Sequence, residues 1–387
     1  MNEQQRQSPM YSYLNEMVDR KATDLYLTVG VPPTLRHENE LSPLTDKPLT
    51  DEDMDKILGE VLTSRQRREF ETSYELNIAM DMSERGRFRV NVLRQRQHNA
   101  MVIRRITSDI PSFSELNLPQ QMENFAMARR GLILVCGVTS SGKSTSLASM
   151  VDYRNTNQQG HIITIEDPVE YYHPHKKSIV TQREVGIDTA AYNVALKNAL
   201  RQKPDVILIG EIRDAEVMEQ AISAAETGHL CLATLHTNNA SQAVERIINF
   251  FPEERHQQIR IALSMNLRAI VAQRLVAKKD SGLTLALEIM KNEALIKELI
   301  LKGETGKIRE VMEQNASAGM KVFDMSLLEL YKKGIISDET AIMESDVPAD
   351  MRMKIKQVNF SGGVSGSSGE NNSSKGMSQI DTSRLSL

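Results

Sequence analysis

Cysteine, tryptophan and long apolar runs are scarce or absent in this sequence of 387 residues. The two cysteines, Cys136 and Cys231, lie in short apolar runs, which predicts buried thiols in a reducing compartment and excludes a disulfide framework. No apolar run approaches the ~18–20 residues that cross a bilayer, and the first residues lack the layout of a signal peptide. We therefore expect a cytoplasmic protein that contacts a membrane only through a partner.

A strong charge of one sign is also missing. The 47 lysines and arginines against 51 aspartates and glutamates give a net charge of −4, and only 4% of residues are aromatic. The sequence therefore lacks both the excess of positive charge and the many aromatic rings that would support nucleic-acid binding. A nucleic-acid translocase stays a disfavoured alternative, and no nucleic-acid partner is expected. No Cys/His cluster has zinc spacing.

The chain divides by pattern into five parts. Residues 1–107 mix alternating strands with an amphipathic helix, which is typical of a small α+β domain, and 108–122 form a linker with two prolines. Residues 123–290 alternate apolar strands with helices, which predicts an α/β core with a largely parallel sheet. Residues 291–358 have helical patterns, and the serine- and glycine-rich residues 359–387 predict a disordered tail.

The segment GVTSSGKST has the spacing G-x-x-x-x-G-K-[ST] between an apolar run and a helical pattern. Such a loop presents successive backbone N–H groups and a helix N-terminus to phosphate oxygens. We predict that it binds ATP, with Lys143 on the outer phosphates and the Ser144 hydroxyl on Mg²⁺. The residues expected to contact the nucleotide are Gly137, Ser140, Ser141, Gly142, Lys143, Ser144 and Thr145.

Two carboxylates follow apolar strands and are predicted to meet at the same edge of the sheet. Glu211 comes after the run 206–209, and Gly210 stands where an acidic residue usually closes such a strand. Glu211 is the candidate base that activates water. Glu166, at the tip of another strand, is the candidate that holds Mg²⁺, partly through water, or orients the attacking water. Each carboxylate also has a structural interpretation without catalysis. Glu211 could simply begin a helix, where a negative charge is favourable, and Glu166 could lie at a solvent-exposed strand end.

Histidines and arginines complete the candidate site. His229 and His236 flank one apolar strand, and His236 is better placed to touch the γ-phosphate. Seven arginines occur between residues 85 and 105 without an acidic residue. They fit a nucleic-acid patch, a set that reaches phosphates bound by a neighbouring subunit, or a solvated strand face. Arg89 and Arg104 lie within predicted strands and are the functional candidates.

These motifs, in this order, resemble those of the secretion ATPase superfamily. GVTSSGKST is similar to its Walker A motif, TIEDPVE to its Asp box, VILIGEIRD to its glycine-substituted Walker B motif and TGHLCLATLHT to its His box. From about residue 14 to 357 the chain resembles the PilT-like retraction motors of type IV pili. The stretch ETGHLCLATLHTNNASQAVERIINFFPEE is more similar to the PilU branch of that family. Val138 and Ser140 depart from the loop pattern, in which proline and glycine are usual.

The resemblance implies an N-terminal PAS-like α+β domain followed by a RecA-like P-loop ATPase domain with a helical C-terminal part. It implies a homohexamer that hydrolyses ATP with Mg²⁺, drives pilus retraction with a PilT-type ATPase, and works at the inner membrane on a PilC-type platform protein. The site residues that carry over are Glu166, Glu211, His229, His236, and, as inter-subunit arginines, Arg89 and Arg104. The alternatives are an ATP-binding accessory subunit with little turnover, and a pilus assembly or type II secretion ATPase.

Overall fold

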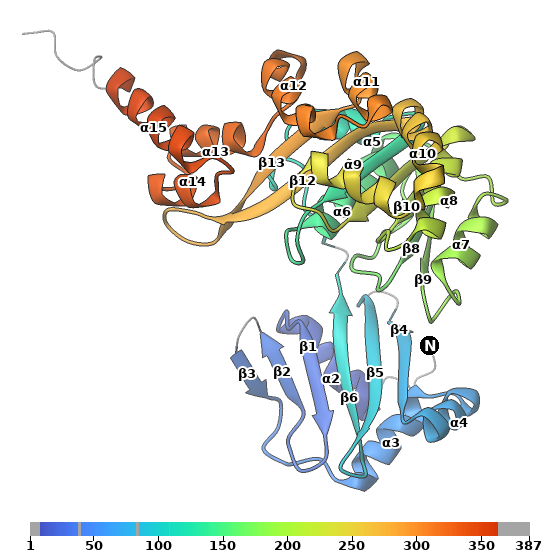
Figure 1. Ribbon diagram of the computed structural model, residues 1–387. Coiled ribbons are helices and arrows are strands. Elements are labelled where there is room, and N and C mark those ends of the chain that lie inside the picture. The colour runs from blue at the N-terminus through green and yellow to red at the C-terminus, as the bar shows by residue number, and fades with distance from the viewer. Residues whose placement is uncertain (1–7, 38–39, 83–84, 108, 363–387) are drawn as a thin grey trace, which may run out of the picture.

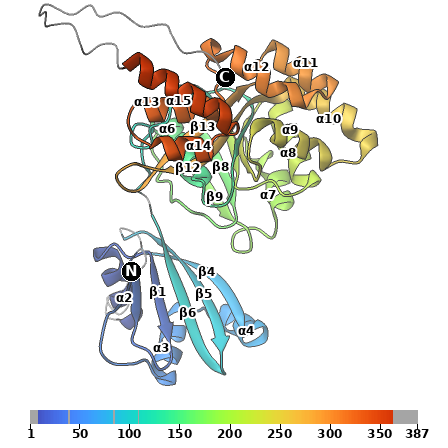
Figure 2. The same ribbon diagram turned by 60° about the vertical axis from the view of Figure 1, so that its left-hand side comes forward.

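The computed structural model describes residues 8–37, 40–82, 85–107 and 109–362. Figure 1 shows an N-terminal domain built on one sheet and a larger α/β domain. Strand β6 (His98–Ile106) ends at the junction between the two domains, and the view in Figure 2 shows the same separation. The predicted α/β class is confirmed, with two sheets and helices packed on them.

Six described strands form the antiparallel sheet of the N-terminal domain, in the order β3-β2-β1-β6-β5-β4. Helices α3 and α4 begin at capping boxes formed by Thr50 and Thr63, and with α2 they bury one face of the sheet. The opposite face carries Arg89 and Arg104, which pair directly across β5 and β6. The bounds are α2 Pro9–Asp19, β1 Asp24–Thr28, β2 Thr34–His37, β3 Glu40–Pro43, α3 Asp51–Val61, α4 Ser64–Ser73, β4 Glu75–Asp81 and β5 Arg87–Gln95.

Seven strands in the described part of the α/β domain form a second sheet, in the order β13-β12-β7-β11-β10-β8-β9. Neighbouring strands are parallel except β12 and β13. Strands β7, β10 and β11 are buried along their whole length, which explains their mostly apolar sequences. The bounds are β7 Gly131–Cys136, β8 Gly160–Glu166, β9 Ser178–Glu184, β10 Val206–Ile209, β11 Leu230–Leu235, β12 Leu267–Ala277 and β13 Leu283–Lys291.

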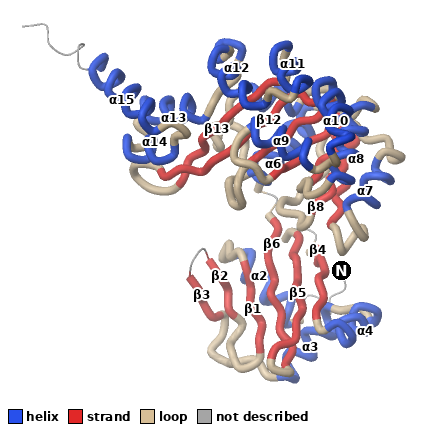
Figure 3. Tube along the Cα trace, in the orientation of Figure 1, coloured by secondary structure: helices blue, strands red, loops and turns tan. Residues whose placement is uncertain are grey.

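Helices cover both faces of this sheet (Figure 3). On one face lie α5 (Gln121–Ala126) and α6 (Lys143–Asn157). The other face packs against α7 Tyr192–Ala199, α8 Ala215–Glu226, α9 Ala240–Asn249 and α10 Glu253–Asn266. Both cysteines lie in this sheet and are buried as free thiols, as predicted.

The C-terminal part is helical after β13, as the sequence pattern predicts. Its elements are α11 Ala294–Lys302, η1 Thr305–Lys307, α12 Ile308–Gln314, η2 Ala316–Ala318, α13 Phe323–Lys332, α14 Asp338–Glu344 and α15 Pro348–Gly362. Helix α15 runs past residue 359, where the sequence predicts the start of a disordered tail, and the rest of that tail lies outside the described residues. Among the helices of the described ranges, none is both long and apolar enough to cross a membrane.

Candidate active site

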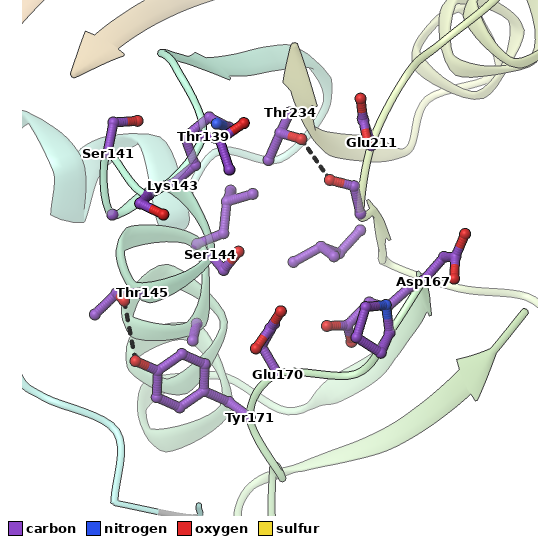
Figure 4. Close-up of a pocket in the computed structure, with 18 of the residues that line it drawn as sticks. Thr139, Ser141, Lys143, Ser144, Thr145, Asp167, Glu170, Tyr171, Glu211 and Thr234 are labelled. Carbon is purple, nitrogen blue, oxygen red and sulfur yellow. Dashed lines mark hydrogen bonds between the residues drawn. The ribbon is translucent and has the colours of Figure 1, made fainter. Parts of the chain in front are cut away.

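The carboxyl ends of four parallel strands meet at one edge of the second sheet, as expected for a ligand site in an open α/β sheet. There β7 leads into the phosphate loop, β8 ends at Glu166, and β10 and β11 end before Glu211 and His236. These segments line a pocket of about 860 Å³ (Figure 4). The N-terminal domain contributes Arg104 and Arg105 to the same pocket, which therefore lies between the two domains.

Only glycine fits the backbone conformation and the available space at the first position of the phosphate loop. A Cβ atom at Gly137 would collide with Ser141 Oγ and lie 2.7 Å from the Gln273 carbonyl oxygen, and φ is +153° there. Gly142, with φ of +85°, precedes the first residue of α6. Ser140 has a left-handed φ of +62°, which strains a residue other than glycine by ~1–2 kcal/mol. The loop thus keeps its shape despite serine where the family pattern has glycine.

Lys143 is the first residue of α6, and its side chain curls over the loop. Its Nζ donates to the carbonyl oxygens of Gly137 (2.9 Å) and Val138 (2.8 Å). Burial lowers the pKa of Lys143, and the charge of Glu211 acts in the opposite direction. The ammonium and the N–H groups of the first helical turn therefore lie together at the pocket, which suits an anion such as a phosphate.

Oxygen atoms that could hold a hard cation surround the first turn of α6. The Ser144 side chain is exposed at the pocket, whereas Thr145 Oγ1 lies 3.0 Å from Tyr171 Oη. Figure 4 shows Glu170 pointing into the pocket from the segment after β8. Within the described ranges, no three His, Cys, Asp or Glu side chains converge on a possible metal position. The Ser144 hydroxyl and the nearby carboxylates are hard oxygen donors, which suit a Mg²⁺ ion that is shared with a phosphate and water.

Glu211 lies between two basic side chains at the tip of β10. Its Oε1 is 3.1 Å from His236 Nε2, and Arg213 Nε donates to its Oε2 at 2.9 Å. Arg213 also lies 3.6 Å from the carboxylate of Asp167, which follows β8. Burial, and next the charge of Lys143, lowers the pKa of His236, so the neutral imidazole is favoured. A carboxylate held in this way beside a phosphate loop can accept a proton from water.

Glu166 is held at the end of β8 by two hydrogen bonds. The Thr164 hydroxyl donates to its Oε1 at 2.6 Å, and Gln182 Nε2 of β9 donates to the same atom at 3.3 Å. Burial raises the pKa of Glu166 to about 7, against the effect of these hydrogen bonds. Glu166 also lines the pocket, where a water-mediated contact to a cation is compatible with its position.

The predicted arginines have different surroundings. Arg104 lines the pocket and forms an ion pair with Asp24 at 2.8 Å. Arg105, which is not one of the predicted site residues, lines the pocket as well, and its buried Nε has no hydrogen-bond partner among the described residues. Arg89 is not among the lining residues and lies 3.8 Å from the buried carboxylate of Glu184. Arg104 and Arg105 line the same pocket as the phosphate loop of their own chain, and the inter-subunit role of Arg89 and Arg104 stays a prediction.

The two histidines of the TGHLCLATLHT segment lie at opposite ends of β11. His236 lines the pocket, whereas His229 precedes the first residue of the strand. The Nδ1 atom of His229 lies 3.0 Å from both Thr227 Oγ1 and the Ala224 carbonyl oxygen, at the end of α8. Within one chain, His236 therefore contacts Glu211, whereas His229 lies at the far end of the strand. A catalytic role of His229 stays a prediction from the resemblance.

Comparisons with known proteins identify the family. The model of the family described as Type II/IV secretion system protein matches residues 68–360. The chain is 48% identical over 344 residues to the type IV pilus ATPase PilU of Pseudomonas aeruginosa, with 89% of this chain and 90% of the relative covered. It is 38% identical over 327 residues to the type IV pilus retraction ATPase PilT of the same organism, with 84% of this chain and 95% of the relative covered.

A solved structure agrees with the sequence relatives. The crystal structure of the pilus retraction motor PilT with bound ADP is 39% identical and superimposes with a TM-score of 0.81. The match covers 88% of this chain and 98% of the PilT chain, so both domains are shared. The chain therefore belongs to the family of type II/IV secretion system proteins, as a relative of the pilus ATPases PilU and PilT.

Proposed function

We propose that this protein is an ATP hydrolase that assembles as a homohexameric motor and drives the retraction of type IV pili. The observation that carries the proposal is the convergence of the phosphate loop, Glu211 and two arginines on one pocket between two domains. The similarity to PilU and PilT, which are named as type IV pilus ATPases, supports it over most of the chain.

The chemistry proposed at the pocket is attack of water on the γ-phosphorus of ATP. Glu211 takes one proton from the water, the water oxygen bonds to phosphorus, and the bond to the bridging oxygen breaks to release ADP and phosphate. Lys143 and the N–H groups at the start of α6 stabilise the charge on the outer phosphates. Arg104 and Arg105 add positive charge from the N-terminal domain, which suits a transition state with charge spread over the equatorial oxygens.

Mg²⁺ belongs to the same proposal. The Ser144 hydroxyl would ligate the ion directly, and Glu166 would hold it partly through water. The ion neutralises phosphate charge when it is bound. His236 holds the Glu211 side chain in position. A catalytic role of His229 would require that it contacts the active site of a neighbouring subunit.

The two-domain pocket suggests how hydrolysis becomes movement. Because opposite walls of the pocket belong to different domains, ATP binding would draw the domains together and product release would let them part. We propose that this motion, in a ring of six PAS-like and RecA-like domain pairs, turns or tilts a PilC-type platform protein at the cytoplasmic face of the inner membrane. A PilT-type ATPase would act together with this ring in pilus retraction.

Steady-state ATP hydrolysis by the purified full-length protein, with particle size measured on the same samples, tests the proposal. Turnover by a hexamer that is abolished in Lys143→Ala and in Glu211→Gln, with assembly intact, is the expected result. In cells, deletion of the gene should reduce the frequency of pilus retraction, and Lys143→Ala should not restore it. Normal retraction after deletion would contradict the motor function.

A second function is favoured by one observation, the strained Ser140 in the phosphate loop. A hexamer that binds ATP but hardly turns it over would be an accessory subunit of the retraction machine, with the PilT-type ATPase supplying most of the hydrolysis. Ser140→Gly should then raise turnover. A pilus assembly or type II secretion ATPase would share this site chemistry, so the direction of pilus movement in cells is the measurement that separates it.

A further inference from the structure

Gly210 is a glycine for reasons of space. Its φ lies outside the left-handed region, so the backbone at the end of β10 would accept any residue. A Cβ atom there would, however, lie 2.9 Å from Tyr192 Oη, 3.1 Å from Glu166 Cα and 3.3 Å from the Ile165 carbonyl oxygen. The position at which an acidic side chain would begin is therefore already filled, and the atom nearest to it is the hydroxyl oxygen of Tyr192.

Tyr192 is the first residue of α7, and it enters the site from outside the motif segments. Its ring packs against the apolar cluster between the sheet and α7–α10, and the residue also lines the nucleotide pocket. Burial, followed by the charge of Asp167, raises the pKa of the Tyr192 hydroxyl, and Glu166 and Glu211 act in the same direction. The Tyr192 hydroxyl therefore lies against position 210, where the neighbouring strands β8 and β10 end side by side.

We propose that the Tyr192 hydroxyl replaces the missing side chain at position 210 and holds the attacking water together with Glu211. A water has two protons to place: one goes to Glu211, and the Tyr192 oxygen accepts a hydrogen bond from the other. In this arrangement tyrosine keeps its proton throughout, its O–H stays available to a neighbouring carboxylate, and the water lone pair is left to face phosphorus. This role rests on the proposed hydrolysis of ATP at the same pocket.

The alternative for Tyr192 is packing alone, since its ring is part of the core. Tyr192→Phe separates the two because phenylalanine keeps the ring and removes only the hydroxyl. The matched control is Tyr153→Phe, because Tyr153 is not among the residues that line the pocket. Its hydroxyl donates a hydrogen bond to Glu123 Oε2 at 3.1 Å. Steady-state kinetics and thermal unfolding of both variants are measured on the full-length protein.

We expect Tyr192→Phe to lower kcat about tenfold, the size expected for the loss of one hydrogen bond in the transition state, while KM for ATP and the Tm change little. Tyr153→Phe should leave kcat unchanged. A kcat for Tyr192→Phe within twofold of the parent, or a loss that follows a fall in Tm, would overturn the assignment. Glu211→Gln is measured in parallel: if it stays active, the proposed site chemistry fails, whereas an inactive Glu211→Gln beside a fully active Tyr192→Phe rejects only the role of Tyr192.

The close contact at position 210 gives an independent test. Gly210→Ala should lower activity and stability in the parent because its methyl group meets the Tyr192 hydroxyl. In the Tyr192→Phe background, the added cost of Gly210→Ala should be smaller, since the nearest atom is gone. Equal effects in the two backgrounds would show that the hydroxyl does not occupy this space.

Discussion

His236 Nε2 lies 3.1 Å from Glu211 Oε1, so the tips of the adjacent strands β10 and β11 bring an imidazole and a carboxylate face to face. The lowered pKa of His236 means that the neutral imidazole is the form that meets Glu211 near pH 7. A neutral imidazole can donate one hydrogen bond without neutralising the base, which suits a group that positions Glu211.

The first prediction compares the two histidines of this segment. His236→Ala should lower kcat by about 10–100-fold, because the base loses its positioning partner. Within one chain, His229→Ala leaves the contact between His236 and Glu211 intact, so kcat should fall less than in His236→Ala. ATPase assays on both variants at equal protein concentration make the comparison. Equal losses would mean that His229 reaches a site on another subunit.

The same histidine sets a pH dependence. Because the folded-state pKa of His236 lies below its ordinary value of 6.5, the folded protein binds fewer protons than the unfolded chain just below pH 6.5. The stability that neutral His236 contributes is therefore present above pH 6.5 and is lost as the pH falls through the lowered folded pKa. Urea unfolding of the parent and of His236→Gln between pH 5 and 8 should show a steeper acid loss for the parent. Parallel curves would contradict the assignment.

The third prediction concerns the ion pair between Arg89 and Glu184, which joins the N-terminal sheet to β9. Burial raises the pKa of Glu184, against the effects of a hydrogen bond from the Val169 N–H and of the charge of Arg89. Removing the arginine should leave this carboxylate less well compensated and loosen the contact between the domains.

Arg89→Met should therefore speed amide hydrogen exchange around the connection at 107–122, while KM for ATP changes less than about threefold because the side chain does not line the pocket. Arg104→Met is the matched variant, since Arg104 does line the pocket, and it should raise KM. If Arg89→Met raises KM as much as Arg104→Met, then Arg89 contacts nucleotide, as its predicted inter-subunit role requires.

The fourth prediction concerns the first glycine of the phosphate loop. Gly137→Ala should weaken ATP binding by at least about tenfold, because the new methyl group meets Ser141 and the backbone of Gln273 and displaces the loop. Gly282→Ala is the control: its φ is also left-handed, at +77°, but among the described residues beyond its two chain neighbours no atom lies within 4 Å of a Cβ atom there. Titration with ATP checks binding, and a similar loss in both variants would point to backbone strain alone.

The fifth prediction concerns Glu288, which is buried on β13 and accepts a hydrogen bond from the Ala240 N–H at 2.7 Å. Burial raises its pKa to about 7 from 4.5. Its contribution to stability is therefore fully present below pH 4.5 and is lost as the pH rises through about 7. Glu288→Gln keeps the acceptor oxygen and removes the titration, so it should be more stable than the parent at pH 8, by roughly 1–3 kcal/mol.

An exposed carboxylate supplies the control for Glu288. Glu219 pairs with Arg255 at 2.7 Å, and this hydrogen bond lowers the pKa of Glu219. Its contribution has the opposite sign, present above the unfolded pKa and lost on acidification, so Glu219→Gln should not gain stability at pH 8. Denaturant unfolding at pH 5, 6, 7 and 8 checks both, and a pH-independent difference between the parent and Glu288→Gln would refute the prediction.

The parts of the fold that follow from sequence are those with a clear local pattern. Strands β7, β8, β10 and β11 coincide with predicted apolar runs because a central strand that is covered on both faces is mostly apolar. The sequence pattern does not predict strands β9, β12 and β13. Helix α10 ends at Asn266 and β12 begins at Leu267, so no glycine or proline marks the change from helix to strand.

By itself, the sequence determined the phosphate loop and the carboxylates that lie at the strand ends, since these depend on residue spacing along a few adjacent positions. The tertiary structure alone decided that Arg105 reaches the pocket, that Arg89 pairs with Glu184, and that Tyr192 fills the space beside Gly210. Tyr192 and Gly210 are 18 residues apart, and they meet because α7 packs against the sheet next to β8 and β10. Contacts of this kind depend on how separate elements pack, and no local spacing of residue types encodes them.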